Sequence, residues 1–195
     1  GAVAKLKVST GTDVSGLTLD SDVTEFIVTS GTLTVSTAQA TGRVISGAGD
    51  VTVNALAANA NLASVSASGT VTANVADDLD YSANTNIATV DAFVIAANKT
   101  GSFSAAQGAK TITLGSGAIA KVKVLTTSDI SGTTLSGSVT KIDVSDNATA
   151  SLSAAQAQKD ITLGSSAVAK LKVSTSTDVS GLTFDSDVTE FIVTS

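Results

Sequence analysis

The residues of this chain that could carry out chemistry are carboxylates and amides. The stretch "ADDLD" at 76–80 places Asp77, Asp78 and Asp80 close together, with Asn74 and Asn84 nearby. Calcium takes about six to eight oxygen ligands, which Asp, Asn and main-chain carbonyls at a turn can supply. Asp77, Asp78 and Asp80 are therefore the candidate metal ligands, with calcium as the candidate cofactor. The alternative is that these residues initiate turns and keep an acidic surface soluble.

Other classes of site are excluded by the residue types that the chain lacks. It has no His and no Cys, so it can form no Ser-His-Asp triad, no thiolate nucleophile and no ordinary zinc site. "GAGD" at 47–50 lacks the spacing of a dinucleotide-binding loop, and no Walker-type lysine loop occurs. The acids recur at periodic turns, whereas a glycosidase needs two converging carboxylates. We therefore expect a protein that is not an enzyme and has no catalytic residue.

Composition and charge narrow the fold class and the partners. Apolar residues make up 43% of the 195 residues and are mostly small or β-branched, which favours strands. The net charge is −6 and no stretch is basic, so we expect no nucleic-acid partner. No apolar run approaches the roughly 20 residues that span a bilayer, so we expect no membrane insertion. Residues 1–30 show no secretory signal pattern.

The strongest signal in the sequence is an internal repeat. Residues 3–30 recur at 168–195, which lie 165 positions later, and only Gly11/Ser176 and Leu19/Phe184 differ. Such repetition is typical of proteins built from stacked structural units. We interpret 1–195 as a single continuous repeat domain in which 3–167 is one 165-residue period and 168–195 is the start of the next. The chain is expected to be a piece of a longer repetitive polypeptide or one subunit of a filament.

A shorter motif runs through this period. An apolar residue is followed by others three and five positions later, as in Val23, Phe26 and Val28. The motif begins at residues 3, 23, 51, 70, 90, 119, 139, 168 and 188, so that successive starts are 19, 20, 28 or 29 positions apart. Short apolar segments between turns predict short strands. We expect these strands to stack in parallel, with Val3, Val23 and Val51 along one sheet and the apolar positions of each motif, Ile119 among them, in the core.

Turn residues recur in step with the strands. Four aspartates open matching segments: Asp13, Asp80, Asp129 and Asp178. An Asp side chain can hydrogen-bond the backbone two residues onward, so each predicts a turn. Gly31, Asn98 and Asn147 follow eighteen positions after the first three aspartates, and they predict left-handed backbone there. Asn98 and Asn147 also match the N-glycosylation sequon, which is the alternative interpretation of those two residues.

Two further columns of polar residues support the stacking. Three glutamines recur at matching places, and we expect them to hydrogen-bond the backbone in a bend or one another: Gln39, Gln107 and Gln156. Opposite charges fall at matching positions of successive strands: Lys5 with Glu25, Lys123 with Asp143, and Lys170 with Glu190. Lys121 would face Lys141 in the same register. Such exposed pairs stabilise by only about 0.2–1 kcal/mol each, so they inform on register more than on stability.

Together these patterns predict an all-β fold, a β-solenoid of stacked parallel coils of about 19–29 residues. The alternative is a series of tandem antiparallel β-sandwich repeats. A sandwich domain needs roughly 100 residues, far more than one unit of this repeat offers.

The strand motif and the composition each carry a resemblance. "VTKIDV" at 139–144 resembles the strand of a leucine-rich repeat. The bias to Thr, Ser, Ala and Val, together with "LSAAQA" at 152–157, resembles the repeat regions of very long bacterial cell-surface proteins of the adhesin or S-layer type. This resemblance implies an extracellular or cell-surface location. We expect a structural solenoid segment that forms a stalk, sheath or filament by stacking and end-to-end association with itself. The alternative is an adhesin repeat module that binds a surface glycan or a protein through its outer face.

Overall fold

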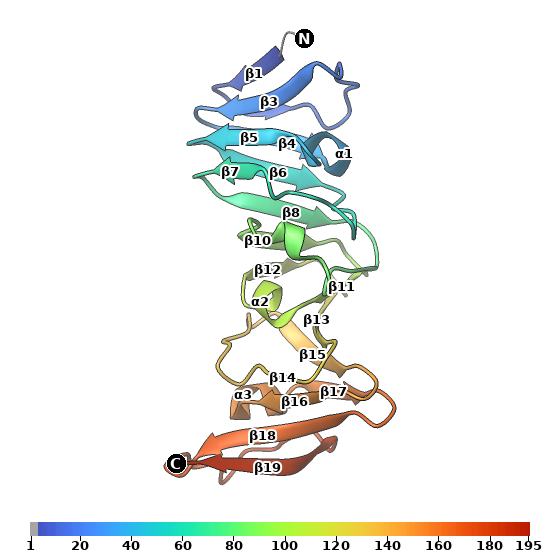
Figure 1. The fold of residues 1–195 in the computed structure, drawn as a ribbon, viewed down its shortest axis with the longest axis vertical. Helices are drawn as coiled ribbons and strands as arrows, with labels where there is room; N and C mark the ends of the chain where they lie inside the picture. Colours follow the sequence, from blue (N-terminus) through green and yellow to red (C-terminus); the bar gives the residue numbers. More distant parts are fainter. Residues whose placement is uncertain (1–3) are drawn as a thin grey trace.

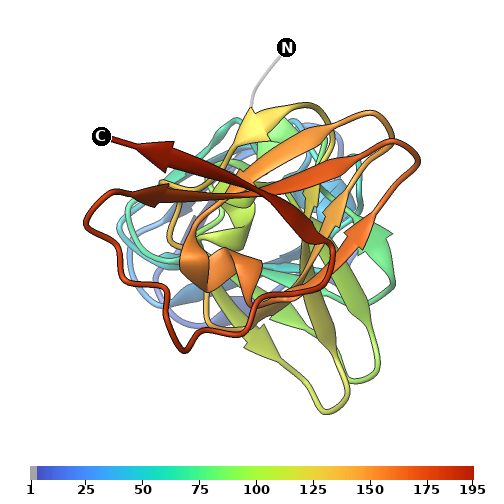
Figure 2. The same ribbon diagram turned by 90° about the horizontal axis from the view of Figure 1, so that it is seen from below.

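The chain forms a long stack of coils. The computed structural model describes residues 4–195 and has about ten turns, with β1 (Ala4–Val8) at one end of the stack and β19 (Val188–Thr194) at the other (Figure 1). Seen along the stack, the coils overlie one another around a common axis (Figure 2). Every strand pairing within residues 4–195 is parallel. The predicted β-solenoid is confirmed, and the antiparallel sandwich alternative is wrong.

The strands form four parallel sheets, which lie on different faces of the stack and overlap along its length. Sheet A contains β1, β3 (Val23–Val28), β5 (Val44–Gly47) and β7 (Val65–Ala67). Sheet B contains β2 (Thr12–Asp13), β4 (Thr32–Ser36), β6 (Asp50–Asn54), β8 (Val71–Val75), β10 (Ala92–Ile95) and β12 (Thr111–Leu114). Sheet C contains β9 (Leu79–Asp80), β11 (Thr100–Phe103), β13 (Ile119–Val124), β15 (Val139–Val144) and β17 (Asp160–Leu163). Sheet D contains β14 (Ser128–Asp129), β16 (Thr149–Leu152), β18 (Val168–Ser174) and β19.

Each coil consists of two strands joined by a tight turn and a third segment that is mostly without strand. The third segment is either an irregular loop or a short helix: α1 (Thr37–Ala40), α2 (Ala105–Gly108), α3 (Ala154–Ala157) or the 3-10 helix η1 (Thr85–Ile87). Paired strand residues lie 18 to 22 positions apart, so one coil takes about 20 residues throughout. No helix within residues 4–195 is long and apolar enough to cross a bilayer.

The position of the strands moves around the coil at two places. After β8 the chain turns a second tight corner at 76–78 and forms β9, which begins sheet C where earlier coils have their third segment. The same happens after β13, where β14 begins sheet D. The intervals of 28 and 29 residues in the sequence motif have a different origin, because they are one coil of about 20 residues plus the passage to the next strand of the coil, as from β3 to β6. The expected shared sheet for Val23 and Val51 is wrong, because Val23 lies in sheet A and Val51 in sheet B. Val3 lies outside the described residues.

After one 165-residue period, the strands return to the side of the stack on which they began. Pairing steps count three coils from β1 to β7, two from β9 to β13 and two from β14 to β18. The corners between β7 and β9 and between β13 and β14 add one further coil, if each corner is taken as a third of a turn. The 165-residue period is thus a whole number of coils, eight, so equivalent residues of successive periods face the same way.

The spacing of the strand motif has a local cause in a β-bulge. Ala120 pairs with Val139 and Lys121 with Lys141, so Thr140 is one residue extra in β15. An extra residue resets the alternation of side chains, and Val139, Ile142 and Val144 are all buried. In β13, which has strict alternation, Ala120 is buried and Ile119 is only half-buried. The expectation that Ile119 occupies the core is therefore wrong for this strand.

The core is one continuous apolar column inside the coils. Its widest section contains Phe93 and Phe103, whose ring centroids lie 4.7 Å apart, and Tyr81, 5.7 Å from Phe103. Burying one such large side chain contributes about 1.5–3 kcal/mol. Because each coil buries its apolar side chains only against its neighbours, the stability of any coil depends on the coil above and the coil below.

The predicted left-handed turns are confirmed. Gly31, Asn98 and Asn147 have φ of 70°, 58° and 58°. Each lies in the tight turn between the two strands of its coil. These three residues therefore mark equivalent corners of the solenoid.

Candidate functional site

The three carboxylates of the acidic loop at 77–80 contact separate partners. Asp77 lies 3.4 Å from the Lys99 ammonium, and Asp78 accepts a hydrogen bond of 2.6 Å from the backbone N–H of Thr100. Asp80 pairs with Lys123 at 2.8 Å. Within residues 4–195, no group of three or more acidic side chains is gathered as metal ligands would be. Calcium binding here stays a sequence-based hypothesis, and the contacts are those expected from the alternative, in which the acids order turns.

The four repeated aspartates are turn initiators, as predicted. Each accepts a hydrogen bond of 2.8–3.0 Å from the backbone N–H two residues onward, at Ser15, Ser82, Ser131 and Ser180. The hydrogen bonds from Ser15 and Ser180 hold the pKa of Asp13 and Asp178 below the usual range. For Asp129, the ion pair with Lys172 and then the Ser131 hydrogen bonds lower the pKa to about 2. Burial alone would raise the pKa of Asp80, but the hydrogen bonds from Lys123 and Ser82 outweigh it.

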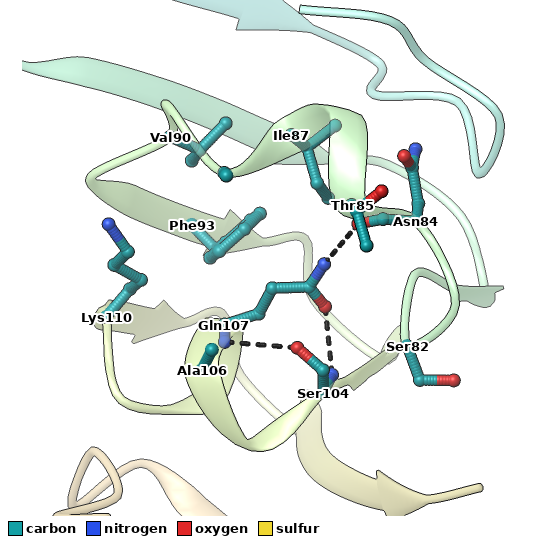
Figure 3. Close-up of a pocket in the computed structure, with 11 residues that line it drawn as sticks. Ser82, Asn84, Thr85, Ile87, Val90, Phe93, Ser104, Ala106, Gln107 and Lys110 are labelled. Atoms are coloured by element: carbon teal, nitrogen blue, oxygen red, sulfur yellow. Dashed lines mark hydrogen bonds between the residues drawn. The ribbon is translucent and has the colours of Figure 1, made fainter. Parts of the chain in front are cut away.

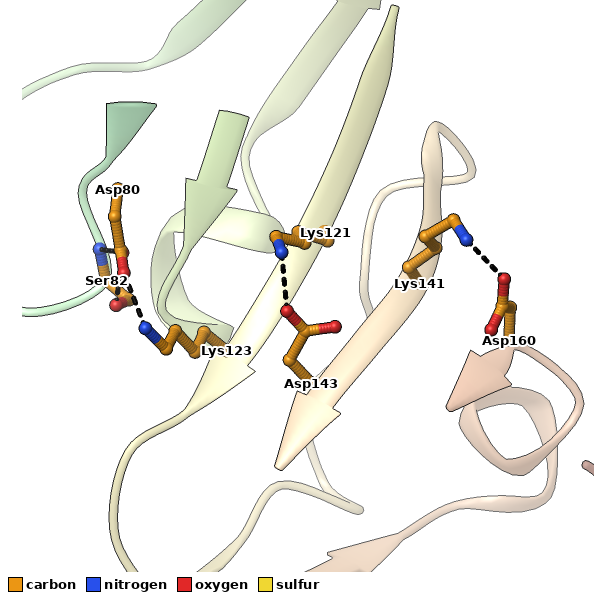
Figure 4. A network of polar contacts seen from close by, with 7 residues as sticks. All are labelled: Asp80, Ser82, Lys121, Lys123, Lys141, Asp143 and Asp160. Carbon is orange, nitrogen blue, oxygen red and sulfur yellow. Dashed lines mark hydrogen bonds and ion pairs between the residues drawn. The ribbon is translucent and has the colours of Figure 1, made fainter. Parts of the chain in front are cut away.

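Ion pairs run across the coils on the outer surface (Figure 4). Lys5 pairs with Glu25 at 2.6 Å and Lys170 with Glu190 at 2.7 Å, as predicted. The predicted strand register of Lys123 and Asp143 is also right, but their ion pair is wrong. Asp143 instead forms an ion pair with Lys121 at 2.6 Å. This pair offsets the repulsion expected between Lys121 and Lys141. Lys141 pairs with Asp160, and Lys123 reaches back to Asp80.

The repeated glutamines join each helical segment to the coil before it. Gln39, Gln107 and Gln156 are buried, and each closes a capping box with the Ser three residues earlier. Their Nε2 groups donate to backbone carbonyls of the preceding coil, at Val14 (2.6 Å), Asn84 (2.7 Å) and Ile130 (2.8 Å). The prediction that they bond the backbone is confirmed. They are structural, because both ends of each amide are satisfied within the stack.

The C-terminal coil exposes residues that are core residues elsewhere in the same repeat. Phe191 and Val193 are 61% and 63% exposed, whereas Phe26 and Val28, in the same repeated sequence, are 0% exposed. β3 lies between β1 and β5, but β19 is the edge strand of sheet D. An edge strand presents unpaired backbone N–H and C=O groups to a further strand. The end of β19 is therefore a surface complementary to one more coil.

The opposite end has the matching feature. β1 is the edge strand of sheet A and pairs with β3 alone. End-to-end association was expected from the sequence, but the sequence analysis named no residues at either end as the contact. The signal for the surface at β19 is the identity of 188–195 with 23–30, because Phe26 and Val28 are buried between neighbouring strands.

No family model, no curated protein and no solved structure matches the chain.

Proposed function

We propose that this protein is a rigid structural segment that assembles end to end with copies of itself into a filament, sheath or stalk. It acts outside the cell, on a bacterial surface, and its role is mechanical and not enzymatic. Its partner is itself, with no part played by nucleic acid or by insertion into a membrane. The composition and the "LSAAQA"-type motif support the bacterial surface location.

The observation that carries this proposal is the exposure of Phe191 and Val193 on an edge strand. A second copy can cover them if its β1 pairs in parallel with β19. In the register of the internal pair of β1 and β3, Leu6 then lies opposite Phe191 and Val8 opposite Val193. Covering both side chains removes apolar surface from water and pairs the free backbone groups at both ends.

The charges at the two ends suit the same contact. Glu190 would lie between Lys170 of its own copy and Lys5 of the next, and Lys5 is itself beside Glu25. These four side chains then form a column across the junction in which positive and negative charges alternate. Because one end of the stack binds the opposite end of the next copy, the contact is heterologous and grows into an open filament.

The test is sedimentation velocity over a range of concentrations, with negative-stain images of the same samples. Wild type should form rods that lengthen with concentration, and Phe191→Lys should remain a monomer of unchanged circular dichroism. Leu125→Lys is the matched control, because Leu125 is 40% exposed at the corner between β13 and β14, in the middle of the stack. A wild type that stays monomeric, or a Phe191→Lys variant that assembles equally well, refutes the proposal. Binding of a glycan by the monomer would instead support the adhesin alternative.

A further inference from the structure

A pocket of about 380 Å³ lies between the loop that contains η1 and the helix α2 (Figure 3). Its wall is largely apolar and includes Ile87, Ala88, Val90, Phe93 and Ala106. This volume is at the lower end of the range of about 300–1,000 Å³ that is usual for small-molecule sites. A ligand with a body of several carbon atoms fits such a space.

The pocket lies where the repeat loses an apolar side chain. Six positions after the repeated aspartate, three units have an apolar residue that is half-buried and packed against the core: Leu19, Leu135 and Phe184. In the unit that begins at Asp80 this residue is Asn86, which is exposed. Thr85 and Ile87, on either side of Asn86, both line the pocket. The apolar side chain of this unit stands one position later, at Ile87, which is buried, so the altered turn and the cavity occur in the same unit.

The same unit also leaves a lysine without its usual partner. Lys159 donates a hydrogen bond to the carbonyl of Val139, and the residues 49 positions earlier are Lys110 and Val90. Within residues 4–195 the Lys110 ammonium makes no hydrogen bond and no ion pair. Lys110 and Val90 both line the pocket, and Lys110 stands at its edge (Figure 3). A cation at the margin of an apolar wall is complementary to a ligand with one anionic end.

Apart from the hydroxyl of Thr85, the other polar side chains that line the pocket are already engaged. Gln107 donates to the carbonyl of Asn84 and accepts from the backbone N–H of Ser104, and Ser82 bonds the carboxylate of Asp80. Within residues 4–195, no buried side-chain nitrogen or oxygen lacks a hydrogen-bond partner. The charge of Lys110 is thus the feature that favours an anionic ligand over an uncharged one.

We propose that this pocket binds a small free carboxylate with an apolar body, of the size of a medium-chain fatty acid. The hydrocarbon part lies in the space beside the turn at which the sister units carry Leu19, Leu135 and Phe184. The carboxylate pairs with Lys110. This site is independent of the end-to-end contact, because α2 and η1 lie in the middle coils of the stack.

The experiment uses the whole chain, with octanoate as the probe and octanamide as its uncharged match. Titration is followed by the amide resonances of Ile87, Val90 and Phe93 and by the methyl resonances of Ile87 and Val90. Octanoate should shift these resonances and bind more tightly than octanamide. Ala106→Leu should weaken the binding of both probes, because Ala106 lines the pocket and a larger side chain there occupies part of it. The folding of this variant is checked by its thermal midpoint.

Lys110→Gln should weaken octanoate binding about fivefold and leave octanamide binding unchanged. Lys159→Gln, the equivalent change in the unit without the pocket, should leave the binding of both probes unchanged. Octanoate that causes no shifts at the three residues, or that binds folded Ala106→Leu as it binds wild type, overturns the proposal. Equal affinity of octanoate for wild type and Lys110→Gln overturns the role of the charge.

Discussion

The ammonium of Lys172 lies 2.6 Å from the carboxylate of Asp129, although 43 positions separate the two residues in the sequence. Lys123 and Asp80 are also 43 positions apart and lie 2.8 Å from each other. In both pairs the first strand of the sheet is joined to the third, across the strand between them. These ion pairs therefore connect coils that share no backbone hydrogen bonds.

The Asp129 pair predicts a component of acid sensitivity. The pKa of Asp129 in the fold is lowered to about 2, below an unfolded value of about 3.9. Its contribution to stability is therefore present above about pH 4 and is lost as the pH falls toward 2. Asp129→Asn should flatten the fall in the free energy of unfolding across this window. The loss at pH 7 should stay below about 1 kcal/mol, because solvent screens an exposed pair.

Urea unfolding at a series of pH values measures this effect. Asp22→Asn is the control, because Asp22 is exposed and forms no ion pair within residues 4–195. The explanation fails if the two variants have the same pH dependence.

The glutamine column predicts a larger loss of stability. Gln156→Ala leaves the carbonyls of Ile130 and Thr133 and the backbone N–H of Ser153 without their partner. Leaving a buried polar group unpaired costs about 1–3 kcal/mol, so we expect a loss of about 2–4 kcal/mol in the free energy of unfolding. Gln158→Ala, at an exposed position two residues later, should change it by less than about 0.5 kcal/mol. Urea unfolding of both variants checks this, and equal effects would contradict it.

The left-handed backbone at position 98 predicts the relative stability of variants with Asn, Gly or Val at this position. Asn98 has φ of 58°, a conformation that Gly adopts freely and a β-branched residue strongly resists. Asn98→Gly should therefore keep wild-type stability within about 1 kcal/mol, and Asn98→Val should lose about 1–3 kcal/mol. Thermal and urea unfolding measure the order. A valine variant as stable as the glycine variant would show that the corner does not constrain φ.

The repeat made most of the fold predictable from the sequence, but it concealed the step between faces. Asp13, Asp80 and Asp129 marked equivalent turns, because the side chain of an aspartate forms the turn locally. The interval of 28 between Val23 and Val51 gave no sign that they lie on different sheets. New sheets begin after the corners at 76–78 and 125–127, which have the unlike sequences ADD and LTT, so no common sequence signal marks where a sheet begins.

The candidate sites were less visible, for a different physical reason. The ion-pair partner of Lys123 depends on how far its side chain reaches across a neighbouring strand, which the strand register alone does not fix. The pocket lies in the unit that has Asn86 where the other three have an apolar residue, so only a comparison of the four aligned units could have indicated it.

Calcium binding by Asp77, Asp78 and Asp80 can be tested by thermal unfolding. To bind an ion together, Asp77 and Asp80 would have to leave Lys99 and Lys123, and Asp78 would have to leave the backbone N–H of Thr100. A ligand that binds the native state raises its stability, by about 2.7 kcal/mol at a concentration one hundred times its dissociation constant. Because all three carboxylates are already paired, we expect the thermal midpoint to be the same in millimolar calcium and in chelator. A midpoint that rises with calcium in wild type, and does not rise in the double variant Asp77→Asn/Asp78→Asn, would contradict this and establish the calcium site.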